Sequence, residues 1–234
     1  MLASLGVPPD MPVVTLHVRE SGYNPAFATS MQFRDAGIAD YRLAVEALKA
    51  RGIWVVRLGD PSMRPAPPGD GLLDYPFTDA KSDWMDAYLA ARCRFHIGTS
   101  SGMSFVPLMY GRPVLFTNWG TLADSVQAPA VLTLPKALID RDGAKVRFAD
   151  YCDRHRVIIE VSDAVPHGLS YRDNSPEELR DAALVMDDAV TAGDGMPRFP
   201  AGCFADQQAV YRGSPMRSGP QIPPSFWQTH YAES

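Results

Sequence analysis

Short apolar runs recur along the first two-thirds of the chain, separated by polar segments. The runs are rich in β-branched residues and nearly free of charge, which is typical of strands buried on both faces of a sheet. They occupy residues 12–18, 53–58, 72–75, 95–97 and 114–116. The segment 61–71, with four prolines and two glycines, separates the second run from the third and predicts a loop.

Helical patterns lie between these runs. Apolar residues at three- and four-residue spacing predict a helix over residues 40–51, capped by Asp40. A second helix is predicted to start at Ser82 or Asp83, with an apolar face formed by Trp84, Tyr88 and Leu89. A third follows the turn 98–102. Strands alternating with helices predict an α/β fold, a Rossmann-like parallel sheet with helices on both faces.

The pattern weakens after Asn118. A helix start is predicted at Ser175, because a proline and a glutamate follow it one and three residues later. Glycine and proline are frequent from residue 193 to 224. We therefore predict one Rossmann-like domain over residues 10–190, followed by a Gly/Pro-rich tail over residues 191–234 that ends in a helix.

Charge and composition exclude several classes of protein. The 234 residues carry a net charge of −5, which argues against non-specific nucleic-acid binding but leaves room for a local basic pocket. No apolar run approaches the roughly 20 residues of a membrane span, so we expect no integral membrane protein. The N-terminus lacks a signal-peptide pattern, and Cys93, Cys152 and Cys203 form no CxxC motif. These features favour a reducing cytoplasm.

The segment Gly98-Thr99-Ser100-Ser101-Gly102 joins a predicted strand to a predicted helix. Backbone N–H groups and small hydroxyls at such a junction can bind a phosphate. Pro107 favours a helix start near Met103 or Ser104, which leaves the N–H groups of residues 101–104 free. The same letters also spell the G-x-S-x-G elbow of esterases, with Ser100 as nucleophile. A simple capping turn is the third interpretation, and the segment alone favours none of the three.

Charged residues follow the ends of two predicted strands. His17 and Arg19 share one face of the first strand, where a guanidinium is placed to bind a diphosphate in a forked geometry. A solvated arginine is the alternative. Arg57 repeats the pattern at the second strand, although an ion pair with a nearby Asp is its expected role. Asp86 lies on the helix before the turn and is a further candidate. The five histidines show no metal-ligand spacing, and no metal site is predicted.

Together these segments resemble the nucleotide-sugar half of a two-domain (GT-B type) glycosyltransferase, and most closely a family of bacterial glycosyltransferases. The resemblance covers about residues 12–190, and residues 114–119 and 222–226 resemble two further motifs of the family. The shared motifs are His17-Val18-Arg19-Glu20-Ser21-Gly22-Tyr23, Arg57-Leu58-Gly59-Asp60, Lys81-Ser82-Asp83-Trp84-Met85-Asp86 and Gly98-Thr99-Ser100-Ser101-Gly102.

The order of motifs is also similar, more distantly, to that of GDP-fucose-dependent fucosyltransferases. This resemblance implies that His17 and Arg19 bind the donor diphosphate and act in catalysis, and that Asp86 reads the base. It also implies that the turn holds phosphate oxygens. The implied ligands in and after the turn are Thr99, Ser100, Ser101, Gly102 and Ser104, with Arg57 as a further donor-binding candidate.

The implied reaction is direct displacement of a nucleoside diphosphate from an activated sugar, with a nucleotide sugar as substrate and no cofactor. Arg19 and the turn would stabilise the leaving diphosphate without a metal. Two-domain glycosyltransferases carry an acceptor-binding half before this one, whereas the first strand here begins about ten residues from Met1. Either the chain is a fragment, or its acceptor-binding half is a separate domain or chain, or it is not catalytic alone. The acceptor's general base is expected in that other half or near Glu20. Two alternatives remain open. One is a non-catalytic nucleotide-sugar-binding module, and the other is an esterase that combines Ser100 with Asp150 and His167.

Overall fold

A computed structural model describes residues 5–8, 10–20, 32–67, 71–120, 122, 125–146, 168–213 and 217–232. Six strands form its main sheet, in the order β3-β2-β1-β4-β5-β6. All five neighbouring pairs are parallel. The strands are β1 (Val13–His17), β2 (Trp54–Arg57), β3 (Leu72–Asp74), β4 (His96–Gly98), β5 (Val114–Trp119) and β6 (Val131–Pro135).

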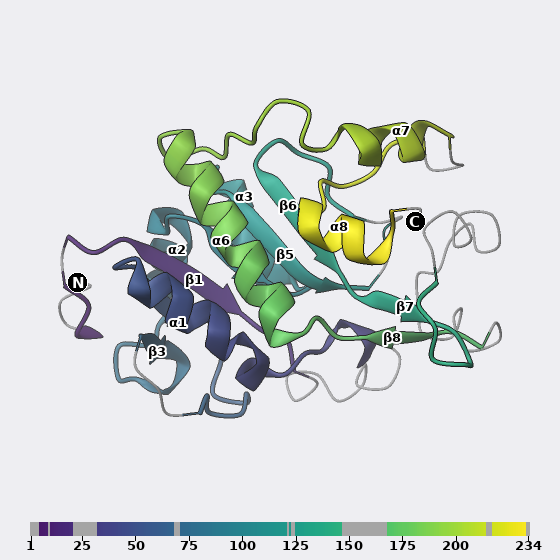
Figure 1. Cartoon of the computed structure of the whole chain (residues 1–234). Helices are drawn as coiled ribbons and strands as arrows, with labels where there is room; N and C mark the ends of the chain where they lie inside the picture. Colours follow the sequence, from purple (N-terminus) through teal and green to yellow (C-terminus); the bar gives the residue numbers. More distant parts are fainter. Residues whose placement is uncertain are drawn as a thin grey trace.

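This strand order is that of the Rossmann fold, in which the chain winds outward from the centre of the sheet in both directions. Helices cover both faces. In Figure 1, α1 (Arg42–Ala50), α6 (Pro176–Ala192) and α8 (Pro224–His230) lie in front of the sheet, whereas α2 (Asp83–Arg92) and α3 (Gly102–Met109) lie behind it. The predicted α/β, Rossmann-like parallel sheet is therefore confirmed.

The remaining elements are short. A two-stranded antiparallel sheet pairs β7 (Ala137–Ile139) with β8 (Ser170–Arg172). The 3-10 helices are η4 (Gln32–Arg34), η5 (Ile38–Tyr41) and η6 (Tyr75–Phe77), and α7 (Ala205–Gly213) lies between α6 and α8. No helix in the described ranges is long and apolar enough to cross a membrane.

The two faces of the main sheet are buried differently. The face toward α1, α6 and α8 belongs to one continuous apolar cluster that includes Leu16, Ile97 and Trp227. The opposite face carries two separate apolar clusters, one beside α2 and one beside α3. Between them, at the centre of the sheet, lie the buried polar side chains of β1 and β4: Thr15, His17 and His96. Burying polar groups is costly, so these side chains mark the region below the carboxyl ends of β1 and β4 as a candidate functional site.

Local capping signals predict helix starts well. Ser82 caps α2 by accepting a hydrogen bond from the backbone N–H of Met85, and Ser175 forms a capping box with Glu178 at the start of α6. The prediction for Asp40 was wrong, because the chain enters α1 through the 3-10 helix η5 and no side chain caps it. Trp84 was also misplaced. Its side chain is 58% exposed and stacks on Tyr88 at the surface.

The C-terminal residues fold onto the same core as the sheet. The side-chain amide of Gln207 donates to the carbonyl of Ile222 and accepts from its N–H, at 2.7 and 3.0 Å. Tyr211 stacks edge-on against Trp227 with ring centroids 5.6 Å apart, and its hydroxyl donates to the carbonyl of Pro220. The residues between α7 and α8 thus pack against α7, and α8 lies against the sheet.

Candidate functional site

The carboxyl ends of β1 and β4 form the centre of the candidate site. These strands are neighbours, paired in parallel with His17 beside Gly98, yet the chain leaves them toward opposite edges of the sheet. Ligands of open α/β sheets bind in the crevice that forms where the strand order reverses in this way. The loops after the two strands are joined there. The N–H of Thr99 donates to the carbonyl of His17 at 3.1 Å, and the N–H of Arg19 donates to the Thr99 hydroxyl at 2.9 Å.

The turn after β4 leads directly into α3. The helix begins at Gly102, one or two residues earlier than the predicted start at Met103 or Ser104, with Ser101 as an extended N-cap. Pro107 is tolerated in the second turn of this short helix, which is why the proline rule placed the start too late. The prediction that all N–H groups of residues 101–104 are free was therefore wrong, because the N–H of Ser104 donates to the carbonyl of Ser101 at 3.0 Å. The positive end of the α3 dipole still faces the crevice.

Two arginines lie at this turn. The Arg19 guanidinium forms an ion pair with Asp35, and both side chains are less than one-fifth exposed, at 17% and 18%. Nε of Arg34 donates to the carbonyl of Ser100 at 2.8 Å. Arg34 was not predicted, since nothing in the local pattern connects it with a turn 66 residues away. Arg19 was predicted, although not its carboxylate partner.

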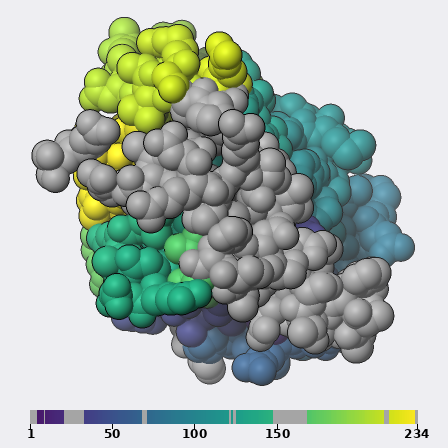
Figure 2. Space-filling model, turned by 90° about the vertical axis from the view of Figure 1, so that its right-hand side faces the viewer, coloured from purple at the N-terminus to yellow at the C-terminus, as the bar shows by residue number. Residues whose placement is uncertain are grey.

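The segment that contains Arg34 crosses the carboxyl side of the sheet. Phe33 packs so closely on Gly120, after β5, that a Cβ there would overlap the phenyl ring. The ammonium of Lys136, which is 4% exposed, donates to the carbonyl of Asp35 at 2.8 Å. These contacts tie the segment to the ends of β5 and β6, so Arg34 and Asp35 are held beside the turn after β4 and beside Arg19. Figure 2 looks onto this side of the molecule, where the teal-green surface around β7 lies near the yellow C-terminal residues.

A buried polar network fixes the end of β5. Asn118 has a positive φ of 50°, and its side-chain oxygen accepts from the N–H of Asn174 while its own N–H donates to the Asn174 side chain. The Asn118 amide also donates to the hydroxyl of Tyr41, which lies 2.7 Å from the Thr117 hydroxyl. Burial raises the pKa of Tyr41 to about 12, so it stays neutral. The network joins β5 to the start of α6 with its donors and acceptors paired.

Histidines 17 and 96 lie beneath the turn. Burial, reinforced by the nearby positive charge of Arg57, lowers the pKa of His17 to about 4. Burial and the neighbouring His17 lower the pKa of His96 to about 3. Within the described part of the chain, Nδ1 of His17, Nε2 of His96 and the Ser104 hydroxyl have no hydrogen-bond partner. Both histidines are therefore neutral at pH 7, and His17 brings a polar ring but no charge to the site.

These lowered pKa values predict a loss of stability in mild acid. Below pH 6.5 the unfolded chain binds protons at both positions, whereas the native protein does not until the pH nears 4 or 3. The free energy of unfolding should fall by about 1.4 kcal/mol per histidine between pH 7.5 and 5.5. Urea unfolding at both pH values checks this, and His17→Asn should show a clearly smaller fall. Equal stability at the two pH values would contradict the neutral, buried state.

The two remaining candidates, Arg57 and Asp86, are held by ion pairs of their own. Arg57 is fully buried, and its guanidinium donates to the carboxylates of Asp74 and Glu20 and to the carbonyl of Arg64 at distances of 2.7–3.3 Å. The ion pair with an Asp that we expected is present, and it holds the loop after β2. Asp86 is bound by Lys81 at 2.6 Å, while its other oxygen is buried without a partner among the described residues.

Neither a metal centre nor an esterase triad is assembled by the described residues. No group of three or more His, Cys, Asp or Glu side chains among them is arranged to hold a metal ion. Asp150 and His167, the partners that an esterase would need, lie outside the described ranges, as do Cys152 and His155. The contact that the structure does give Ser100 is structural: its backbone carbonyl accepts a hydrogen bond from Arg34.

Comparisons with known proteins find only distant structural similarity, over part of the chain. No protein-family model and no curated protein matches the sequence. Among solved structures, the chain is similar to TibC, a dodecameric iron-containing heptosyltransferase in complex with ADP-D-beta-D-heptose, at 18% identity and a TM-score of 0.36, over 54% of this chain and 33% of that one. It is similar to E. coli ADP-heptose LPS heptosyltransferase II at 16% identity and a TM-score of 0.37, over 49% and 34% of the two chains. The matched part spans about a third of each enzyme.

Proposed function

We propose that the crevice between β1 and β4 binds the diphosphate of a nucleoside-diphosphate sugar, and that the chain is the donor-binding half of a glycosyltransferase. The observation that carries the proposal is the convergence of Arg19, Arg34 and the N-terminus of α3 where the strand order reverses. Guanidinium groups and a helix N-terminus are the features that bind phosphate oxygens in proteins. The motif resemblance described above supports the same assignment.

The chemistry follows from where the charges lie. When a sugar is displaced from its donor, negative charge develops on the leaving diphosphate, and positive groups held in place beforehand lower that barrier. Asp35 holds the Arg19 guanidinium by an ion pair, and an incoming diphosphate would compete with that carboxylate for it. We propose that no divalent metal takes part. Loss of most of the donor binding in EDTA would argue against this.

The acceptor's general base is proposed to come from a second domain or chain. Glu20 is the nearest acidic candidate in sequence, but one of its oxygens lies 3.3 Å from Arg57 and the other accepts the N–H of Arg64 at 2.8 Å. Both oxygens of this carboxylate are thus already engaged by the end of β2 and the loop after it, so neither is free to take a proton from an acceptor hydroxyl. A non-catalytic nucleotide-sugar-binding module would use the same crevice. Turnover of a donor by this chain together with its acceptor-binding partner would distinguish the two functions.

A thermal-shift screen of nucleoside diphosphates tests the proposal. One of GDP, UDP, CDP, ADP and dTDP is expected to raise the melting temperature, because a ligand that binds only the native state stabilises it by about 2.7 kcal/mol at a hundredfold excess over its Kd. ADP-heptose, the donor named for TibC, belongs in the same screen. If all of these ligands leave the melting temperature unchanged, the crevice is not a nucleotide site.

A further inference from the structure

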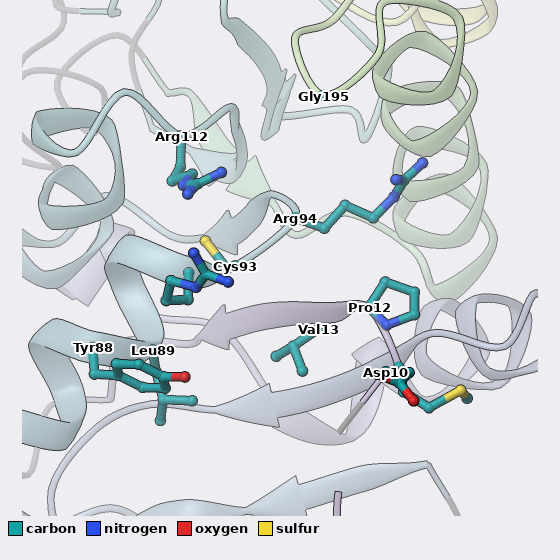
Figure 3. Close-up of a pocket in the computed structure, with 11 residues that line it drawn as sticks. Asp10, Pro12, Val13, Tyr88, Leu89, Cys93, Arg94, Arg112 and Gly195 are labelled. Atoms are coloured by element: carbon teal, nitrogen blue, oxygen red, sulfur yellow. The ribbon is translucent and has the colours of Figure 1, made fainter. Parts of the chain in front are cut away.

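A second pocket lies at the opposite, amino edge of the sheet. It has a volume of about 400 Å³, which falls within the range of small-molecule sites. Figure 3 shows Arg94, Arg112 and Gly195 on one side of it and Val13, Tyr88 and Leu89 on the other. Because β1 and β4 enter the sheet here and leave it at the other edge, this pocket is separate from the crevice proposed to bind the donor.

Three arginines from different segments line this pocket. Arg92 ends α2, Arg94 follows it before β4, and Arg112 lies between α3 and β5. In a chain with a net charge of −5 such a concentration of positive charge is unusual. Asp10 is the one acidic side chain among the lining residues.

These arginines differ in how far they are neutralised. Arg94 is anchored to α6, with Nε 2.8 Å from the Asp187 carboxylate and a terminal nitrogen 2.6 Å from the Thr191 hydroxyl. No carboxylate of the described residues lies within ion-pairing distance of Arg92 or Arg112. Like charges at short range repel one another, and a bound anion would relieve that repulsion.

A purely structural role explains only part of this arrangement. Nε of Arg112 donates to the carbonyl of Ala91 at 2.6 Å, which satisfies a free carbonyl at the end of α2. Arg92, in the last turn, also complements the negative end of the helix dipole. Among the described residues, however, the terminal nitrogens of Arg112 make no hydrogen bond. The planar fork that these nitrogens form suits two oxygens of one phosphoryl group.

The rest of the lining suits an organic group. Tyr88 is held by stacking on Trp84, with ring centroids 5.4 Å apart, and Leu89 and Val13 are buried apolar neighbours. Burial raises the pKa of the Cys93 thiol to about 11, so it adds no negative charge to the pocket.

We propose that this pocket binds a small organic phosphate, with the phosphoryl group on Arg92 and Arg112 and the organic part against Tyr88, Leu89 and Val13. Its volume exceeds what a bare phosphate needs, and Val13, Tyr88 and Leu89 lie across from Arg94 and Arg112. A phosphate suits the site better than a carboxylate, since it carries more charge and three oxygens for the guanidinium groups.

Calorimetric titration with phenyl phosphate tests the proposal, with inorganic phosphate and phenol as reference ligands. Phenyl phosphate is expected to bind at one site and more tightly than either reference. Arg92→Ala and Arg112→Ala should each weaken it roughly 10–100-fold, the loss expected for a hydrogen-bonded charged group. Arg42→Ala is the matched control, because Arg42 is exposed and its one ion pair among the described residues is with Glu46, within α1. It should leave the affinity unchanged.

Two further comparisons keep the outcome clear. Arg19→Ala removes a charge from the proposed donor site. Phenyl phosphate binding that is unchanged in Arg19→Ala and weakened in Arg92→Ala belongs to the second pocket. Should Arg112→Ala fail to fold, Arg92→Ala decides, because the Arg92 side chain is exposed. Absence of phenyl phosphate binding in the wild-type protein, or affinity unchanged in Arg92→Ala, would overturn the proposal and leave these arginines as caps of α2.

Discussion

Replacing Arg19 with Ala is expected to weaken nucleoside-diphosphate binding by roughly 1.5–3 kcal/mol, the usual scale for hydrogen bonds to charged groups. Arg19→Lys should also weaken binding, because an ammonium cannot reproduce the planar fork that pairs two phosphate oxygens. Calorimetry on both variants, with the nucleoside diphosphate selected by the thermal screen, measures the change. The Arg19 backbone is bound to Thr99 in every variant, so only the side chain is tested.

The ion pair with Asp35 makes a stability control necessary. Arg19→Ala leaves that carboxylate without this partner, although Asp35 remains partly exposed and its backbone carbonyl is still held by Lys136. We therefore expect a modest fall in melting temperature beside a large loss of affinity. Unfolding of Arg19→Ala would instead make Arg19 chiefly a structural partner of Asp35. Retained affinity in both Arg19 variants would remove Arg19 from the donor site.

Gly98→Ala is expected to destabilise the protein strongly. A Cβ at this position of the central strand β4 would lie 2.5 Å from Nε2 of His96 and 2.8 Å from Cβ of Ser104. Neither neighbour can withdraw easily, because His96 is fixed to Thr15 at 2.9 Å and Ser104 is buried in α3. Overpacking of this kind typically costs about 1–3 kcal/mol. A chain of this size loses roughly 2–4 °C of melting temperature per kcal/mol, which calorimetric melting resolves.

Gly102→Ala is the matched control for this change. Apart from its chain neighbours and the backbone of its own helix, a Cβ at Gly102, at the first position of α3, would meet no atom of the described residues within 4 Å. Alanine also suits a helix better than glycine. The melting temperature should therefore be retained. Because Gly102 borders the crevice, the added methyl group should nevertheless reduce diphosphate affinity. Equal melting temperatures for Gly98→Ala and the wild type would show that α3 does not pack on β4 as described.

The sequence predicts the sheet well where the signal is local. The first four strands lie within one or two residues of their predicted positions, because short apolar runs with loop signals at their ends mark buried strands. Arg57 was expected to pair with an Asp, and Asp74 provides that partner. The strand β6 was missed. Its run Val131–Pro135 carries the same short apolar signal as the other strands, so it could have been predicted; its parallel pairing with β5 places it at the edge of the sheet.

In the candidate site, some contacts between residues far apart in sequence could not be predicted. His17, Arg19 and the turn 98–102 meet as expected because they follow neighbouring strands. Arg34 reaches Ser100 only because its segment crosses the sheet edge, a path set by contacts such as Phe33 on Gly120 and Lys136 with Asp35. Such contacts join residues far apart in sequence, and no periodicity records them. Trp84 was assigned to the buried face of its helix, because helical spacing cannot distinguish a ring stacked at the surface from a core residue.

An amide-resolved NMR titration with the selected nucleoside diphosphate tests the central claim most directly, because it locates the diphosphate. We predict that the amide signals of Ser101, Gly102 and Met103, at the start of α3, shift with one saturable Kd equal to the calorimetric value. The amide signals of Arg92 and Arg112, at the amino edge, should show much smaller shifts at the same ligand concentration. Shifts confined to the amino edge, or anywhere away from the ends of β1 and β4, would contradict the assignment of this crevice as the donor site.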